Sequence, residues 1–337
     1  MGRAMTVSRR RFLALITAGV LPAVATAACG TTAAPVPSIP TLTLAPLPVA
    51  LATIAPTPTV VPSLTATLVP ATPAIPTDPE GFADPAFRRL WDTSDRDIAA
   101  GKVSRTWLWG PKPFAVRREP FAQSPGGVRL VQYFDKSRME INDPNGNRAE
   151  AWFVTNGLLT TEMVAGRVQV GLAAFEALEP ADVPIAGDLE SPDPSTPRYA
   201  DFTPIASLNG TNRARAQPGA PVVTRIARGG ATGPIDKAPV AVKLASFEET
   251  LGHNIPDVFV NYFSALNAMG LNWVFVTGYP ISEPYWVSAR IGGQVQVLLV
   301  QLFERRALTY NPRNKDGWQI EFANIGLHYY RWRFHNR

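Results

Sequence analysis

The 337-residue chain has a single cysteine, Cys29, and only three histidines. One cysteine forms no disulfide within the chain, and no two histidines have the i, i+4 spacing of a helical metal site. The motifs G-x-S-x-G, H-E-x-x-H, G-x-G-x-x-G and the P-loop are also missing. We therefore expect no metal, no cofactor and, more readily than an enzyme, a non-catalytic protein.

The chain also lacks a basic excess outside its first residues. Of 32 lysines and arginines, four lie in residues 1–28, which contain no acid. Removing those four leaves 28 cations against 27 aspartates and glutamates. A mature chain this close to neutrality gives no electrostatic reason to expect nucleic acid as a partner.

The N-terminus resembles a twin-arginine export signal. Arg9 and Arg10 are followed by Phe12 and Leu13 at the head of an apolar run over residues 12–25. That run is too short to span a hydrocarbon core of about 30 Å and has the size of a signal sequence. We expect residues 1–28 to be removed on export.

Cys29 directly follows this run, after Thr26, Ala27 and Ala28. The segment resembles a lipobox, which implies a diacylglycerol on Cys29 and a membrane anchor at the outer face. Residues 25–27 also satisfy the A-x-A rule of ordinary signal cleavage, so a secreted, unlipidated protein is the alternative. Either way, we expect the mature protein to be extracytoplasmic.

A proline- and threonine-rich segment follows, with no charged residue from Cys29 to Thr77. Proline disfavours the interiors of helices and sheets, and such segments adopt extended polyproline II geometry. We expect a disordered, semi-rigid stalk over residues 29–80.

The rest of the chain contains an internal similarity about 168 residues apart. Glycines, prolines and aromatic residues recur in the same order around Gly126-Gly127 and Gly292-Gly293. A Gly-Gly turn, an apolar strand, a charged turn and a second strand are typical of a hairpin. The expected strands are 128–134 and 139–141 in the first copy, and 295–303 and 307–310 in the second.

Helical spacing of apolar residues predicts a helix before each copy, over residues 85–98 and 258–271. The predicted fold class is β-rich α+β, with two divergent repeats of short antiparallel hairpins, each with a preceding helix. Residues 158–176 fit either a helix or a strand. The expected boundaries are 81–180 for the first lobe, 181–243 for a Pro/Gly-rich connector and 244–337 for the second lobe.

The second copy resembles the LGFP repeat of cell-surface proteins. The resemblance rests on Gly278-Tyr279-Pro280, the Gln-x-Phe pattern of residues 301–303 and the close Asn324-Ile325-Gly326. The chain is also similar to uncharacterised exported lipoproteins of Chloroflexi-type bacteria. These resemblances imply a location in the cell envelope and contact with the cell wall.

Aromatic residues are the first candidates for ligand contact, because their rings stack on sugar faces. The five candidates are Trp109, Tyr133, Tyr279, Tyr285 and Trp286. Packing in the core is the alternative role for all five.

Glu119 and Glu283 are candidate acids, since both belong to Glu-Pro-aromatic segments that the repeat matches with each other. A hydrolase needs only two suitably placed carboxylates. The simpler role is a turn cap or an arginine partner. We expect His328 to pack in the core and His253 to orient the following helix.

Together these features predict a surface-tethered, non-catalytic lipoprotein that binds an envelope polymer, such as a glycan or peptidoglycan, or a surface protein. An envelope-modifying hydrolase and a structural spacer are the alternatives.

Overall fold

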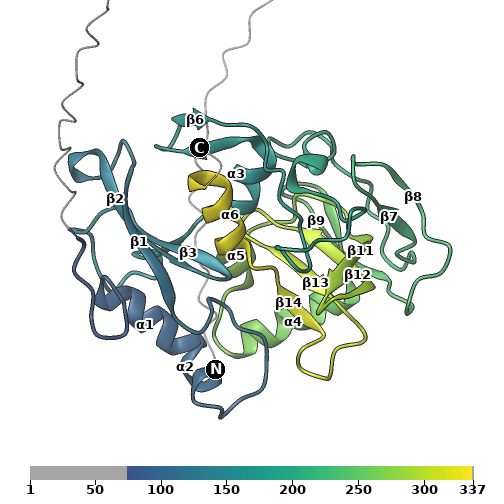
Figure 1. Cartoon of the computed structure of the whole chain (residues 1–337), viewed down its shortest axis with the longest axis horizontal. Helices are drawn as coiled ribbons and strands as arrows, with labels where there is room; N and C mark the ends of the chain where they lie inside the picture. Colours follow the sequence, from purple (N-terminus) through teal and green to yellow (C-terminus); the bar gives the residue numbers. More distant parts are fainter. Residues whose placement is uncertain (1–73, 336–337) are drawn as a thin grey trace, which may run out of the picture. The chain divides into compact units, whose positions relative to one another are not determined.

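The computed structural model describes residues 74–335. The expected export signal with Arg9, Arg10, Phe12 and Leu13, the lipid-attachment residue Cys29 and residues 29–73 of the expected stalk lie outside these residues. Residues 74–335 belong to one compact unit (Figure 1). No helix in this described part is long and apolar enough to cross a membrane.

The first sheet is an antiparallel meander of four consecutive strands. The strands are β1 (Pro113–Pro120), β2 (Val128–Phe134), β3 (Ser137–Ile141) and β4 (Thr155–Asn156). A short 3-10 turn, η1 (Pro125–Gly127), links β1 and β2, and Gly126 adopts a positive φ of 70° there. Glycine reaches this conformation without steric cost, so the Gly-Gly pair reverses the chain as the sequence predicts.

The second sheet has six strands in the order β14-β13-β12-β11-β7-β8. These strands are β7 (Thr224–Ile226), β8 (Thr232–Pro234), β11 (Tyr285–Ile291), β12 (Gln294–Leu302), β13 (Ala307–Tyr310) and β14 (Ile320–Phe322). Strands β11 to β14 form an antiparallel meander. By contrast, β7 joins β11 in parallel, through the single pair Arg225 and Trp286. The β7–β8 hairpin is therefore attached at one edge of the meander.

Helices precede and follow each meander. Before them lie α1 (Pro85–Ser94), α2 (Arg96–Ala99), α4 (Asp257–Ala268) and α5 (Trp273–Thr277), and after them lie α3 (Leu159–Ala165) and α6 (Ile325–Phe334). Asp84 caps α1 by accepting from the amide of Ala86, and Pro85 suits the first turn. The helix predicted over 85–98 ends at Ser94, and α2 begins at Arg96. Residues 158–176, left open by the sequence, contain α3, one whole strand of a small sheet and the start of its second strand.

Two small sheets complete the fold, β5 (Arg167–Gln169) with β6 (Phe175–Ala177) and β9 (Leu244–Glu248) with β10 (His253–Pro256). The expected connector also contains the 3-10 helix η2 (Tyr199–Phe202). Its side chains Tyr199 and Phe202 are buried in the main core. The connector therefore packs as part of the compact unit.

One hydrophobic cluster joins both meanders. It contains Val131 and Tyr133 of β2, Val300 of β12, Met163 of α3 and Tyr329 of α6. Both halves of the described chain thus share a core, and its buried apolar surface stabilises them together. The β-rich α+β prediction is confirmed, with several antiparallel hairpins.

Candidate functional site

The structure buries three of the five aromatic residues proposed for ligand contact. Trp109, Tyr133 and Trp286 have at most 1% of their surface exposed. The Trp286 indole donates to the Val222 carbonyl at 2.8 Å, and the Tyr133 hydroxyl donates to Glu119 at 2.5 Å. With so little surface exposed, these three rings offer no face on which a sugar could stack. They are core residues here, which is the alternative role that the sequence left open.

Tyr279 and Tyr285 are half-buried, so part of each ring reaches the surface. Tyr285 lines a pocket of about 280 Å³ together with Glu283 and Gln217. The tryptophan that the structure exposes is instead Trp152, which packs edge-on against Phe275.

Glu119 belongs to a buried ionic network rather than to a cleft. The network consists of three glutamates and three arginines: Glu119, Glu140, Glu162, Arg129, Arg138 and Arg333. Burial opposes ionisation of Glu119, but Arg138 and Arg333 outweigh it and hold its pKa below the usual value. The three carboxylates and three guanidinium groups neutralise one another and link β1, β2, β3, α3 and α6. The network therefore has a structural role.

Glu283 has a different environment from Glu119. Its Oε1 accepts from the Asn254 amide at 2.9 Å and lies 3.1 Å from His253 Nδ1, while its Oε2 accepts from Asn254 Nδ2 at 3.0 Å. The carboxylate therefore ties β10 to the start of β11. His253 orients this carboxylate rather than the following helix directly.

The two acids do not occupy matching positions, contrary to the sequence alignment of the two copies. Glu119 pairs with Arg129 near the end of β1. Glu283 precedes β11, whose register begins with Tyr285 opposite Val300. The Glu-Pro pairs are thus displaced along their strands, and the structure does not bring the two carboxylates together.

His328 is buried, as expected, and its Nδ1 lies 2.9 Å from the Tyr199 hydroxyl. Burial, reinforced by the positive charges of Lys136 and Arg331, lowers the pKa of His328 to about 3. The folded protein keeps this ring neutral, whereas the unfolded chain protonates it near its ordinary pKa of 6.5. Acid therefore favours the unfolded state through this group.

We expect the His328→Gln variant to lose part of the acid sensitivity of the wild type. As the pH falls from about 6.5 to 3, His328 costs the folded wild type on the order of 4 kcal/mol, because each pKa unit corresponds to about 1.4 kcal/mol. Urea unfolding at a series of pH values measures this loss. An equal pH dependence of the unfolding free energy in the two proteins would contradict this expectation, because the folded protein would then protonate His328 as readily as the unfolded chain does.

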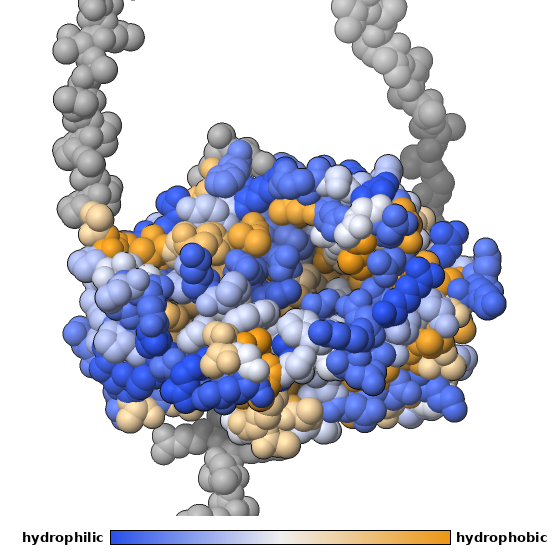
Figure 2. All heavy atoms as spheres, turned by 60° about the horizontal axis from the view of Figure 1, so that its bottom comes forward, coloured by the Kyte–Doolittle hydropathy of each residue, from blue (hydrophilic) through white to orange (hydrophobic). Residues whose placement is uncertain are grey.

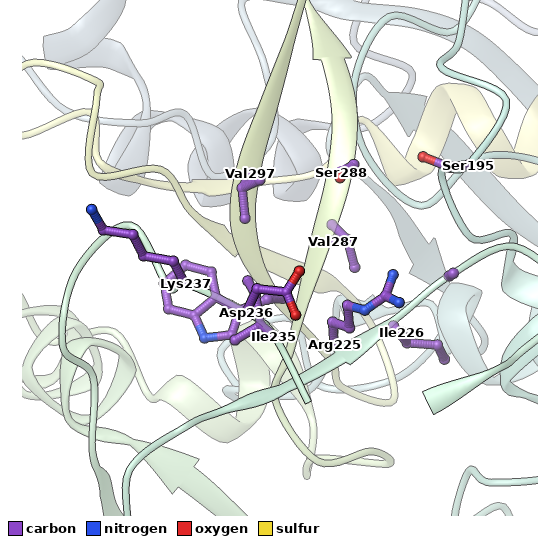
Figure 3. A pocket seen from close by; sticks show the side chains of 11 residues that line it. Ser195, Arg225, Ile226, Ile235, Asp236, Lys237, Val287, Ser288 and Val297 are labelled. Atoms are coloured by element: carbon purple, nitrogen blue, oxygen red, sulfur yellow. The ribbon is translucent and has the colours of Figure 1, made fainter. Parts of the chain in front are cut away.

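A pocket with both polar and apolar walls lies where β7 meets β11. It is a groove of about 380 Å³, which we call the β7–β11 groove (Figure 3). Its lining residues are Ser195, Arg225, Ile226, Ala227, Ile235, Asp236, Lys237, Trp286, Val287, Ser288 and Val297. Strands β7, β11 and β12 and two connector loops thus supply its walls.

The groove combines an apolar base with a charged and hydroxylated rim. Ile226, Trp286 and Val287 of this lining are buried, whereas Ile235 and Val297 are half-buried. Figure 3 shows Arg225 and Asp236 reaching toward the space beside Val287, while Lys237 extends from the same loop as Asp236. Within residues 74–335, the side chains of these three exposed charged residues have no hydrogen-bond or ion-pair partner. The rim is therefore free to bind polar groups of a ligand.

One residue of this lining, Trp286, is also a sequence-predicted candidate for ligand contact. Sequence reasoning missed Arg225, Asp236 and Lys237, because these lie in the Pro/Gly-rich connector and belong to no recognisable motif. In the same described range, no three His, Cys, Asp or Glu side chains converge as a metal ion would require. On the face in Figure 2, hydrophobic residues are scattered among hydrophilic ones. We take the β7–β11 groove as the candidate site, because three charged side chains of its lining have no partner within residues 74–335.

Comparisons of the chain with protein-family models, with curated proteins and with solved structures found no match.

Proposed function

We propose that this protein is a surface-tethered, non-catalytic module whose β7–β11 groove binds an envelope polymer. The observation that carries the proposal is the groove itself, an open channel with an apolar base and three unpartnered charged side chains on its rim. Small-ligand sites commonly combine apolar walls with a few convergent polar groups. The expected export signal and lipid anchor on Cys29 would place such a module at the envelope.

The lining suits a glycan in particular. The apolar faces of sugar rings fit against the half-buried Ile235 and Val297. Ser195, Ser288 and Asp236 offer partners for hydroxyl and amide groups. An open groove, unlike a closed cavity, also admits one segment of a long chain. A cell-wall glycan or peptidoglycan strand therefore fits better than a surface protein.

Filling the groove should abolish polymer binding. We expect the Ser195→Trp variant of the full-length protein to lose at least about tenfold in retention on insoluble peptidoglycan, because the indole occupies the space of the ligand. Ser195 is exposed, so the fold tolerates the larger side chain. Co-sedimentation at increasing polymer concentration measures retention.

Ser264→Trp is the matched control, since Ser264 is exposed on α4 and does not line the groove. It should bind as the wild type does. Equal retention of both tryptophan variants would move the binding site away from the groove. The Tyr285→Ala/Trp286→Ala pair is less informative, because Trp286 is a core residue and its loss costs about 3–5 kcal/mol of stability.

A second candidate function, an envelope-modifying hydrolase, is favoured by one observation: Glu283 lies on the wall of the pocket that Tyr285 lines. Its three hydrogen-bond donors fit a bracing role better, because they already occupy both oxygens. Turnover of an envelope polymer that Glu283→Gln abolishes, with the fold intact, would select the hydrolase instead.

We also propose that the two meanders are divergent repeats, and that the helix that follows each meander packs against the other meander. The amide of Thr161 in α3 donates to the Glu304 carbonyl, in the turn between β12 and β13. The amide of Leu327 in α6 donates to the Asp135 carbonyl, in the turn between β2 and β3. Each helix thus packs against the hairpin of the other half.

Side chains in the two turns support the same correspondence. Lys136 donates to the Phe322 carbonyl just before α6, and Arg305 donates to the Asn156 carbonyl just before α3. The glutamines of the Gln-x-Phe patterns also match. Gln132 bonds the backbone that leads into α1, and Gln301 bonds the Asn254 carbonyl ahead of α4. Duplication of one ancestral unit explains why Lys136 and Arg305, and likewise Gln132 and Gln301, make equivalent hydrogen bonds in the two halves.

A further inference from the structure

We infer that the β7–β11 groove selects an anionic polymer, one whose repeating units carry carboxylate or phosphate groups. The inference rests on the proposed function and adds the chemical class of the ligand. It starts from Arg225 and Lys237, two exposed cations on the rim that have no acidic partner within residues 74–335.

A second pair of arginines extends this positive region along the wall. The Arg228 amide donates to the Ser195 carbonyl at 3.0 Å, which places Arg228 beside the groove. Arg228 and Arg198 share one carboxylate, Asp182, at 2.8 and 3.8 Å. Burial, followed by repulsion from Arg228, lowers the pKa of Arg198. Asp201, which accepts from the Arg198 amide at 2.8 Å, is a second acid beside Arg198.

Among the residues that line the groove itself, the two cations Arg225 and Lys237 lie against one acid, Asp236. Asp182 is shared as described, and Asp193 is engaged by the Ser195 amide and hydroxyl. The lining therefore has one cation in excess. Arginine binds carboxylate and phosphate oxygens through paired N–H donors, and a cation-lined groove attracts such groups from solution.

The test compares two charge-neutralised variants of the full-length chain. Arg225→Gln/Lys237→Gln removes the unpartnered rim cations. Lys112→Gln/Arg118→Gln is the control, since both residues are exposed and their side chains have no partner within residues 74–335. Lys112 precedes β1 and Arg118 lies in it, and β1 lies apart from β7 in Figure 1. The probes are immobilised polygalacturonate, immobilised poly(glycerol phosphate), neutral amylose and insoluble peptidoglycan.

We expect the wild type and the control to bind at least one polyanion, and the rim variant to bind it about tenfold more weakly at low salt. Preference between polygalacturonate and poly(glycerol phosphate) identifies carboxylate or phosphate as the recognised group. Binding should weaken between 0.05 and 0.5 M salt, as screening shortens the reach of the charges.

The inference would be overturned if the protein is retained on amylose or peptidoglycan and neither salt nor the rim substitutions change that retention. The proposed polymer-binding function would then still stand. Equal weakening in the rim and control variants would overturn the inference as well, because the attraction would then be general. Absence of retention on all four probes would overturn both the inference and the proposed function.

Discussion

The Gly326→Ala variant should be destabilised by about 3 kcal/mol. Gly326 lies in the first turn of α6, and a Cβ at this position would overlap the Phe134 carbonyl and approach the Ser137 backbone. Both contacts are with backbone atoms of the β2–β3 turn, which cannot rotate away as a side chain can. The helix must therefore move, and overpacking of this kind costs about 1–3 kcal/mol or more. Urea unfolding measures the loss.

Hydrogen exchange in the same variant tests the exchange of helices between the halves. Because α6 follows the second meander but contacts the first, exchange should accelerate in β2 and β3. Gly233→Ala is the control, since Gly233 has nothing within 4 Å of an added Cβ and no positive φ. Acceleration confined to β11–β14 would contradict the proposed packing of α6 across the two halves.

The Arg138→Met variant should lose about 3–5 kcal/mol of unfolding free energy. Arg138 is fully buried, and its guanidinium lies 2.8 Å from Glu140, 3.2 Å from Glu162 and 3.5 Å from Glu119. Replacing it leaves three buried carboxylates with two arginines. An unpaired buried charge costs far more than the intact network contributes. Chemical denaturation near neutral pH measures the effect.

A second substitution separates charge imbalance from lost packing. Burial outweighs Arg138 and raises the pKa of Glu162, which makes Glu162 the member of the network most easily neutralised. In the Arg138→Met/Glu162→Gln double variant the numbers of charges balance again. Its stability should therefore exceed that expected from adding the two single losses. If the loss of unfolding free energy in the double variant equals the sum of the two single losses, the effect of Arg138→Met comes from lost packing alone.

The hairpins could be predicted from the sequence, because their signals are local. The strand predicted over 128–134 is β2 with the same bounds, and β13 likewise matches the prediction of 307–310. Gly292 and Gly293 adopt φ of 57° and 80° between Ile291 and Gln294, which close a two-residue turn. A Gly-Gly pair between alternating apolar residues specifies such a turn with little help from the rest of the fold.

The helices that follow the meanders could not be predicted in the same way. In α6 the buried face has helical spacing, but it includes the polar side chains of His328 and Arg333. Leu327, Tyr330 and Phe334 on the other sides are apolar or aromatic and half-buried. Hydrophobicity alone therefore marks no apolar stripe in this helix. Its position depends on contacts with the distant β2–β3 turn, which no local pattern reveals.

The sequence does not show which of the candidate aromatic residues reach the surface or which charged residues lie near them. Tyr133 and Trp286 lie on strands covered on both faces, and strand alternation then gives no indication of which ring meets solvent. The β7–β11 groove forms only when Arg225 pairs with Trp286, about 60 residues later in the chain. Its charged residues look like ordinary loop residues until that long-range pairing brings them together.

Hydrogen exchange of the full-length protein, free and bound to insoluble peptidoglycan, tests the central claim most directly. If the β7–β11 groove binds the polymer, protection should appear over residues 225–237 and around Ser195. Protection centred on Trp152, or on Gln217 and Glu283, with residues 225–237 unchanged, would contradict the account and place the binding surface elsewhere.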